Sequence, residues 1–289
     1  MPGISETDLI LNSNGSVYHL NLLPEHVSET VIAVGDPDRV EMVSQYFDRV
    51  EFKIRKREFV THGGVLRGKK IMVISTGMGT DNIEIFFTEL DALANVNLRS
   101  RTIKSRQKKL KIIRIGTSGS FQKDVPVDSH VVTDYAIGLD SLMHFYKFKM
   151  NWVEKQIARE VMRRARLGYM PYVAKGSKTL LQQIGHDMIV GNTLTTPGFF
   201  APQGRTVRLS PKYPKMLSNL AAEGNKLHGL RLLNFEMETA GYYALARLLK
   251  HETLSVSAIV ADRVRGQFSK DPNGVIDSLI RKVLERISD

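Results

Sequence analysis

Short runs of β-branched and aliphatic residues alternate with longer amphipathic segments along most of the chain, and this alternation constrains the fold more than any other feature. Several runs are apolar throughout, as in strands that are buried on both faces of a sheet. Strands are predicted at residues 30–34, 49–54, 58–66, 70–75, 111–115, 130–137, 188–194 and 254–261. Helices are predicted at residues 81–95, 152–167, 211–228, 236–251 and 276–287. The alternation predicts an α/β fold around a mostly parallel central sheet.

Nothing in the sequence divides the chain into parts. The 289 residues contain no Pro-, Gly- or Ser-rich linker and no internal repeat, so a single domain over residues 1–289 is predicted. The absence of cysteine excludes disulfides, thiolate nucleophiles and iron–sulfur clusters. No apolar run is long enough to span a bilayer, and residues 1–8 lack the order of a secretory signal. We therefore expect a cytoplasmic protein that does not associate with membranes.

The positive charge of the chain is concentrated in one segment. Lys and Arg number 41 against 30 Asp and Glu, a net charge of +11, and seven of these cations fall within residues 99–111, where there is no acid. Without them the balance would be 34 against 30. The segment lacks the aromatic residues on which bases stack, so residues 97–111 are interpreted as a basic surface insertion that could shape subunit contacts or an entrance. Nucleic acid is not an expected partner.

Three glycine-containing motifs do not meet the requirements of the sites that they resemble. The segment 63–70 has Lys70 where a P-loop offers a hydroxyl to magnesium, and a strand follows it instead of a helix. The segment 77–82 has Asn82 in place of the third glycine of a dinucleotide fingerprint. The segment 116–120 lacks the spacing of a nucleophile elbow, and the histidines show no metal-ligand spacing. Nucleotide hydrolases, serine hydrolases and metal hydrolases are thereby disfavoured, and no metal is expected.

Three predicted strands end in groups that suit an anion. Residues 31–34 lead into Gly35 and Arg39. Residues 113–115, which include Arg114, lead into the segment 116–119, where two glycines flank the hydroxyls of Thr117 and the serine after it. The third is the turn at residues 77–79. Glycine lets backbone N–H groups approach an anion, and arginine offers a planar fork of donors. Because ligands of open parallel sheets collect beyond the carboxyl ends of the strands, we expect all three turns to face one phosphate.

Together with residues 234–239, Asn-Phe-Glu-Met-Glu-Thr, these motifs carry a resemblance. The chain resembles the nucleoside phosphorylases of the hexameric phosphorylase superfamily, and among them most closely the uridine phosphorylases. The resemblance runs in the family's order from residues 17–20 to residues 259–263. It implies one α/β domain around a mixed, barrel-like sheet flanked by helices, with an active site shared between two subunits. It also implies a homo-oligomer, a dimer at the least, with a hexamer as the larger alternative.

The resemblance also implies a role for each matching position. The phosphate ligands would be Gly35, Arg39, Arg114 and Thr117, with Arg57 supplied by a neighbouring subunit. The ribose would be held by Glu238, Met237 and Glu236, with His19 of the neighbour at the 5′-hydroxyl. The base would be bound by Phe199, Gln203 and Arg205, near Asp262 and Arg263. No organic cofactor is implied, since inorganic phosphate is a co-substrate. A monovalent cation at a subunit interface could be held by Glu58, Asn82 and the Met78 carbonyl.

These residue types suit phosphorolysis of a nucleoside, in which uridine and phosphate give uracil and ribose 1-phosphate. Arg39 and Arg114 would orient the anionic nucleophile. Glu238 would stabilise the cationic sugar, and Gln203 with Arg205 would stabilise the departing pyrimidine anion. A plainer interpretation of Glu238 is a first-turn carboxylate that complements a helix dipole behind an Asn234 N-cap.

The adjacent pair Asp262 and Arg263 leaves the base open. Purine-specific relatives place an aspartate near this point to protonate the purine, whereas an arginine partner would keep Asp262 ionised and make it a poor proton donor. Gln203 and Arg205 favour a pyrimidine. The alternatives are a purine nucleoside phosphorylase or nucleosidase on the same scaffold and, from another class, a nucleic-acid-binding protein that uses the basic segment.

Overall fold

The computed structural model describes residues 3–221, 226–227 and 229–288. The strands are β1 (Thr30–Val34), β2 (Arg49–Lys56), β3 (Phe59–Leu66), β4 (Lys69–Ser75), β5 (Val96–Asn97), β6 (Thr102–Ile103), β7 (Lys111–Ser120), β8 (His130–Gly138), β9 (Tyr172–Lys175), β10 (Ile189–Thr195), β11 (Lys226–Leu227), β12 (Leu230–Glu236), β13 (Glu252–Asp262) and β14 (Gln267–Phe268). The helices are α1 (Asp38–Ser44), α2 (Thr80–Asn95), α3 (Trp152–Ala165), α4 (Lys178–Ile184), α5 (Met216–Ala221), α6 (Thr239–Leu249) and α7 (Pro272–Ser288).

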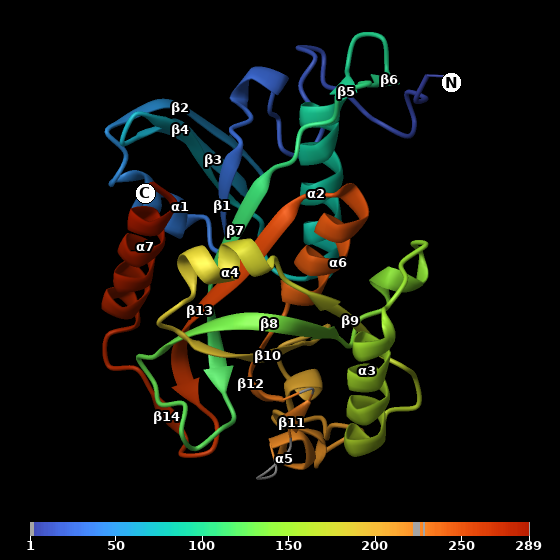
Figure 1. Ribbon diagram of the computed structural model, residues 1–289, viewed down its shortest axis with the longest axis vertical. Helices are drawn as coiled ribbons and strands as arrows, with labels where there is room; N and C mark the ends of the chain where they lie inside the picture. The colour runs from blue at the N-terminus through green and yellow to red at the C-terminus, as the bar shows by residue number, and fades with distance from the viewer. Residues whose placement is uncertain (1–2, 222–225, 228, 289) are drawn as a thin grey trace.

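One mixed sheet organises the described residues (Figure 1). The strands β7, β13, β8, β10 and β12 follow one another, and antiparallel pairing of Asn234 with Ser120 and of Phe235 with Gly119 joins β12 back to β7. These five strands form a closed barrel, and β1, β4, β3 and β2 extend the sheet from β7. The expected α/β fold around a barrel-like sheet is confirmed. The expectation of a mostly parallel sheet is wrong, because hairpins make β2–β3–β4 antiparallel and β13 runs against β8.

Helices cover both faces of the extended part of the sheet. In β1 the side chains of Val31 and Ala33 pack in the cluster that contains residues of α2 and α6. Those of Ile32 and Val34 pack in the cluster that contains residues of α1, α4 and α7. Successive strand residues point to opposite faces, so this strand is apolar throughout. Figure 1 shows α1 and α7 on one side of β1, and α2 and α6 on the other.

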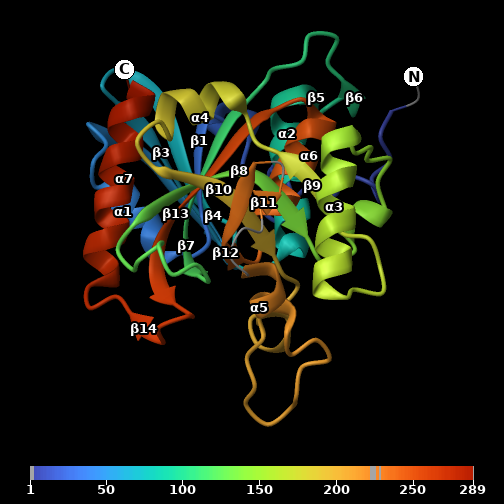
Figure 2. The same ribbon diagram turned by 60° about the horizontal axis from the view of Figure 1, so that its bottom comes forward.

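Most predicted elements are present, with shifted ends. The predicted helix 211–228 is wrong in its extent: the helix covers only Met216–Ala221, and residues 222–225 and 228 lie outside the described part. Pro214 disfavours helical backbone at the residue before it, so the helix begins after this proline. In Figure 2 the loop that precedes α5 projects from the body of the molecule, and Val207 and Leu209 on it are 78% and 74% exposed.

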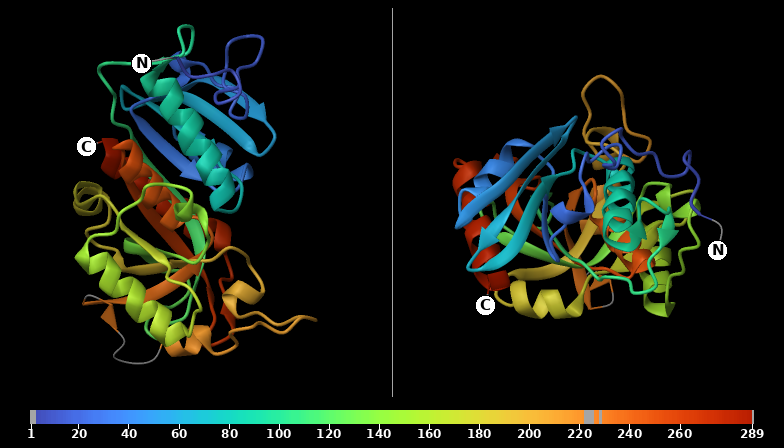
Figure 3. Two further views of the ribbon diagram at one scale, coloured as in Figure 1. Left: turned by 90° about the vertical axis from the view of Figure 1, so that its right-hand side faces the viewer. Right: turned by 90° about the horizontal axis from the view of Figure 1, so that it is seen from above.

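Residues 97–111 form an excursion at one end of the molecule. The short strands β5 and β6 pair as a hairpin, and an extended stretch then leads into β7. Buried Asn95 anchors this stretch, because its side chain accepts from the Lys108 N–H at 2.7 Å and donates to the Lys108 carbonyl at 3.1 Å. Figure 3 shows this excursion beside α2, at the opposite end of the molecule from α3. No helix in the described ranges is long and apolar enough to cross a membrane.

Candidate active site

A cavity of about 560 Å³ lies at the carboxyl ends of β1, β4, β7 and β12. Its walls come from distant stretches of the chain, as expected for a site at this edge of a sheet. The lining includes Gly35, Asp36, Pro37, Arg39, Glu58, Gly77, Met78, Arg114, Thr117, Ser118, Gly119, Phe199, Gln203, Arg205, Phe235, Glu236, Met237, Glu238, Val260, Ala261 and Phe268. The volume is in the range of pockets that bind small molecules.

A buried arginine and two carboxylates form the floor of the cavity. Nη2 of Arg114 lies 2.6 Å from Oε2 of Glu238 and 3.1 Å from Oε2 of Glu236, and all three residues are buried. Burial alone would lower the pKa of Arg114, but the two carboxylates raise it above its ordinary value. With both carboxyl groups ionised, the Arg114 guanidinium balances only one of them, so a further cation such as Arg39, or a positive charge that develops in the reaction, is favourable there.

The second half of β7 makes room for the Arg114 side chain. Residues 116–119 were expected as a turn, but they continue the strand, because Gly116 and Thr117 pair with Ser257 and Ala258 of β13. Arg114 and residue 116 face the same side of the strand. A Cβ at position 116 would lie 2.1 Å from Nη1 of Arg114. Glycine at this position is therefore what allows the guanidinium to lie across the strand.

The start of α6 holds Glu236 and Glu238 in place. Oε2 of Glu236 accepts from the backbone N–H groups of Glu238 and Thr239, both at 2.9 Å, and Oε1 accepts from the Thr195 hydroxyl at 2.6 Å. Oε1 of Glu238 accepts from the Gly79 N–H at 2.8 Å. The Asn234 N-cap interpretation is wrong, because Asn234 lies in β12 and donates to the Ser118 hydroxyl at 2.8 Å. Glu236 satisfies the free N–H groups of the helix instead.

A second guanidinium stands beside this cluster. Nη2 of Arg39, at the start of α1, approaches the Thr117 hydroxyl to 3.5 Å. Burial lowers the pKa of Arg39, and the charge of Arg114 acts in the same direction, against Asp36. A group whose positive charge is penalised by burial and by a like charge gains when an anion arrives. Arg39, Thr117 and the Gly35 backbone therefore surround a position that favours an anion.

Three residues after β10 that contact one another line another part of the cavity. Gln203 is buried and donates to the Thr196 hydroxyl at 3.0 Å, while its amide oxygen accepts from Arg205. The Arg205 guanidinium carbon lies 3.7 Å from the centre of the Phe199 ring. Burial lowers the pKa of Arg205 to about 10, and the charge of Arg263 contributes. Arg205 is thus a cation beside an aromatic face, with donors left over for an oxygen of a ligand.

Four residues of the predicted site do not line this cavity. Asp262 is buried, and its carboxylate accepts from the backbone N–H groups of Val264 and Arg265 and from the Arg265 guanidinium at 3.1 Å. The prediction of an arginine partner for Asp262 is confirmed. The guanidinium carbon of Arg263 lies 5.7 Å from the Phe235 ring centre, and the guanidinium donates to the Gln203 carbonyl at 3.4 Å.

The other two, His19 and Arg57, share a different surface. The Tyr18 ring lies 4.8 Å from the His19 ring and 5.7 Å from the Arg57 guanidinium carbon. Arg57 is exposed, in the turn between β2 and β3, and its neighbour Glu58 lines the cavity. The chain therefore brings together the two residues that the resemblance assigns to a neighbouring subunit.

Sequence reasoning missed the polar residues that support this site. Thr195 bridges Glu236 and the Ala240 N–H, and the Ser255 hydroxyl contacts Thr239 at 2.9 Å. Glu89 holds His19 at 2.7 Å. The available signal was a polar side chain on an otherwise apolar strand or helix face, since such a group needs a buried partner.

The three residues that the resemblance assigns to a cation lie close together. Glu58 and Met78 both line the cavity, and the Asn82 amide donates to the Met78 carbonyl at 3.3 Å. A carboxylate, a carbonyl and an amide oxygen fit a hard cation, provided that the Asn82 amide is turned to present its oxygen. The three groups would supply part of a shell.

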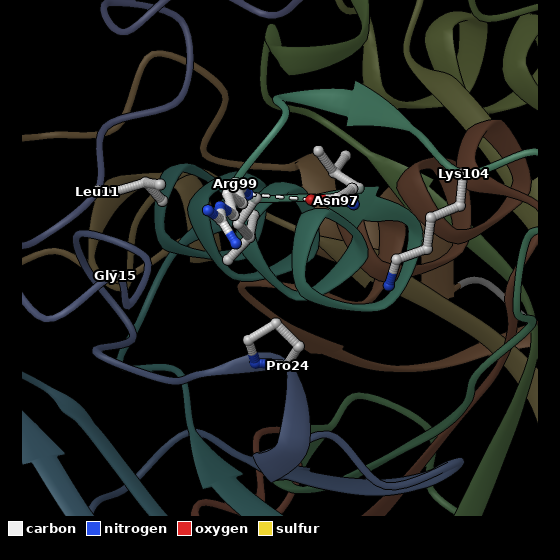
Figure 4. A pocket seen from close by; sticks show the side chains of 8 residues that line it. Leu11, Gly15, Pro24, Asn97, Arg99 and Lys104 are labelled. Atoms are coloured by element: carbon white, nitrogen blue, oxygen red, sulfur yellow. Dashed lines mark hydrogen bonds between the residues drawn. The ribbon is translucent and has the colours of Figure 1, made fainter.

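Two other cavities adjoin the basic segment. Figure 4 shows Leu11, Pro24, Arg99 and Lys104 around one of about 550 Å³. The second, of about 860 Å³, has Lys104, Arg106, Lys108 and Lys109 in its wall. Neither shares a lining residue with the carboxyl-end cavity. Within one chain, the basic segment therefore does not line the carboxyl-end cavity.

Burial raises the pKa of Glu238 above its ordinary value, with Arg114 acting against this and Glu236 adding to it. The folded chain then binds this proton more tightly than the unfolded chain does, so the contribution of Glu238 to stability falls as pH rises from about 4.5 through the folded pKa. Urea unfolding of the wild type and Glu238→Gln between pH 4 and 8 measures this. We expect the wild type to lose stability relative to the variant as pH rises; a constant difference would contradict the shift.

Comparison with known proteins agrees with this geometry. A family model described as the phosphorylase superfamily matches residues 29–283. Uridine phosphorylase of Thermococcus kodakarensis is 28% identical over 261 residues, which cover 89% of this chain and 81% of the relative. A DeoD-type purine nucleoside phosphorylase of Caldanaerobacter subterraneus is 26% identical over 257 residues, covering 86% and 89%.

A solved structure of a Trypanosoma brucei nucleoside phosphorylase, described as showing uridine phosphorylase activity, superposes with a TM-score of 0.90 at 27% identity. The match covers 98% of this chain and all of that one. With most of its length matched by the family model and by this neighbour, the chain belongs to the phosphorylase superfamily.

Proposed function

We propose that this chain is a pentosyltransferase that cleaves uridine with inorganic phosphate, giving uracil and ribose 1-phosphate. The observation that carries the proposal is the convergence of Arg39, Arg114 and Thr117 with the Glu238 carboxylate in one cavity that Gln203 and Arg205 also line. The names of the relatives support the same reaction class, since both the uridine and the purine enzymes among them are nucleoside phosphorylases.

Phosphate binds between Arg39, Arg114, Thr117 and the backbone at Gly35, with Arg57 reaching in from a neighbouring subunit. The guanidinium groups form charge-assisted hydrogen bonds with the anion and hold it beneath the sugar. Holding the two reactants together makes the encounter effectively unimolecular. The anion also offsets the burial that lowers the pKa of Arg39, and the repulsion from Arg114 that adds to it.

The ribose lies over Glu238 and Met237. Two lone-pair positions of the Glu238 carboxylate are used by Arg114 and the Gly79 N–H, which leaves acceptor capacity for sugar hydroxyls. As the glycosidic bond breaks, positive charge develops on the sugar, and the fixed carboxylates stabilise it more than they stabilise the neutral substrate. Glu236 is a positioning residue here, because the helix start and Thr195 occupy its oxygens.

The base lies against Phe199, Gln203 and Arg205. Arg205 donates to the carbonyl oxygen on which negative charge gathers as uracil leaves, and Gln203 meets the ring edge as donor and acceptor. A purine substrate is less favoured, because the Asp262 carboxylate already accepts hydrogen bonds from the Val264 and Arg265 backbone N–H groups and from the Arg265 guanidinium. A proton donor for a purine ring would need a free carboxyl group in the cavity.

We also propose a homo-oligomer in which one subunit supplies His19 and Arg57 to the cavity of another. Both residues lie beside Tyr18, and neither lines the cavity of its own chain. A two-fold arrangement would give each subunit one complete site. Glu58, Asn82 and Met78 would contribute to a monovalent cation at this junction.

Absorbance changes with uridine or inosine, each with and without phosphate, test the proposed reaction. Uridine should be consumed only when phosphate is present, with uracil and ribose 1-phosphate formed in equal amounts. Consumption of inosine with inert uridine would identify a purine enzyme. Cleavage without phosphate would identify a nucleosidase.

Replacing Arg205 by alanine should lower kcat/KM for uridine about a hundredfold, because removing one donor to a developing oxyanion costs about 2.7–4 kcal/mol. Phosphate affinity should stay within about twofold, since Arg205 contacts Phe199 and Gln203 and is not one of the proposed phosphate ligands. Arg208→Ala is the matched control, an exposed arginine three residues along the same loop, and it should behave as wild type. If Arg205→Ala weakens phosphate affinity as much as it lowers kcat/KM for uridine, Arg205 does not act specifically on the base.

A further inference from the structure

Helix α2 carries a buried carboxylate that the proposed chemistry does not use. Glu89 lies on the apolar face of this helix with Phe86, Leu90 and Leu93, and it is 7% exposed. A carboxylate in such surroundings is costly unless it is fully hydrogen-bonded. Its partners all lie 69 or 70 residues away, in the segment that contains His19.

Four hydrogen bonds fix this segment on Glu89. Oε1 accepts from the His19 backbone N–H at 2.9 Å and lies 2.7 Å from Nδ1 of the His19 ring. Oε2 accepts from the backbone N–H groups of His19 at 3.0 Å and Leu20 at 2.8 Å. Both carboxylate oxygens are therefore directed at one short stretch of backbone and at one imidazole.

The contact with Nδ1 determines which ring nitrogen carries the proton. An ionised carboxylate only accepts, so Nδ1 of His19 must donate to it, and in the neutral ring Nε2 is then an acceptor. Among the described residues Nε2 has no hydrogen-bond partner, and the His19 side chain is 27% exposed. The Tyr18 ring, at 85° to the imidazole, restrains it from one side. The imidazole is thus held in one orientation with a free acceptor.

We propose that Glu89 is a positioning residue for catalysis: it holds the His19 imidazole with Nδ1 protonated, so that Nε2 accepts a hydrogen bond from the ribose 5′-hydroxyl. This inference rests on the proposed function, in which His19 meets that hydroxyl in the cavity of a neighbouring subunit. A carboxylate behind a histidine fixes its tautomer and direction in the same way that outer residues orient metal-bound histidines.

The test compares uridine with 5′-deoxyuridine, which lacks the hydroxyl. Glu89→Gln should lower kcat/KM for uridine about tenfold, the smaller end of what loss of a histidine-orienting partner costs. The kcat/KM for 5′-deoxyuridine should change by less than about twofold, because that substrate lacks the hydroxyl that His19 would bind. The double variant His19→Ala/Glu89→Gln should match His19→Ala alone, since the two residues act as one unit.

Glu84→Gln is the matched control. Glu84 lies on the same helix and accepts from the hydroxyls of Tyr146 and Thr88 instead of from His19, so this variant should leave both substrates unaffected. If Glu89→Gln lowers both substrates equally, Glu89 only supports the fold and the proposal fails. If the wild type is inactive with uridine and phosphate, the proposed function fails instead.

A second measurement needs no variant at position 89. In ¹⁵N spectra of histidine-labelled wild type at alkaline pH, with His19→Ala to assign the signal, we expect a protonated Nδ1 and a bare Nε2 for His19. A protonated Nε2 would overturn the inference even if Glu89→Gln does not fold.

Discussion

Replacing Arg114 by methionine should abolish measurable phosphorolysis and lower the free energy of unfolding by about 3–5 kcal/mol, the cost of leaving a buried charge without its partner. Methionine fills much of the arginine volume, so the loss reports the charge and not a cavity. Glu236 and Glu238 would then face one another without a cation between them. Like charges in this position favour protonation of one carboxyl, so part of the lost stability should return as pH is lowered.

Urea unfolding between pH 5 and 8 and phosphate-dependent turnover of uridine measure the two effects. Arg49→Met is the control, because Arg49 forms an exposed pair with Glu51 at 2.7 Å and exposed pairs contribute about 0–1 kcal/mol. Wild-type stability in Arg114→Met would show that the cluster is not held by this guanidinium. If Arg114→Met turns over uridine within about tenfold of the wild-type rate, Arg114 is not a phosphate ligand.

Mixing two nearly inactive variants should restore activity if the site is shared between subunits. In a two-fold dimer of His19→Ala and Glu238→Ala chains, one site of each mixed pair receives both intact groups. Random mixing in equal amounts then gives roughly a quarter of the sites in wild-type form. The expected result is recovery to about a quarter of wild-type activity after the chains are unfolded and refolded together.

The matched mixture is Glu238→Ala with Arg114→Met, since both lesions lie in the cavity of the same chain. No mixed pair can repair a site in that case, and no recovery is expected. If the first mixture also fails to recover, although mass spectrometry shows mixed oligomers, His19 does not cross an interface. Recovery in both mixtures would mean that Arg114 and Glu238 serve different sites.

The sequence predicted those parts of the fold that local patterns determine. β1 is an uninterrupted apolar run, and the structure places it at the predicted residues, Thr30–Val34. β12 was missed because its sequence, Leu-Arg-Leu-Leu-Asn-Phe-Glu, is rich in residues that also suit helices. Its pairing with β10 and β7, which closes the barrel, makes it a strand. The seven-residue helix α1 is too short to leave a periodic pattern.

The candidate site, like the fold, could be predicted from the sequence only in part. Gly35, Arg39 and Glu238 come after the ends of strands and Arg114 lies within β7, and the topology brings all four into one cavity as expected. The hydrogen bonds of Asp262 to Val264 and Arg265 depend on the path of the chain after β13, so the sequence left its role open. Glu89 and His19 are 70 residues apart, and only the packing of α2 shows that one holds the other. The resemblance to phosphorylases is confirmed by the family match; the individual roles stay predictions.

A crystal structure with phosphate and 5′-deoxyuridine or uridine bound tests the central claim most directly. We expect phosphate between the Arg39 and Arg114 guanidinium groups and the Thr117 hydroxyl, with the ribose hydroxyls on Glu238 and the uracil ring against Arg205. Phosphate held only by the basic residues 99–111, with the nucleoside absent from the carboxyl-end cavity, would contradict the proposed active site.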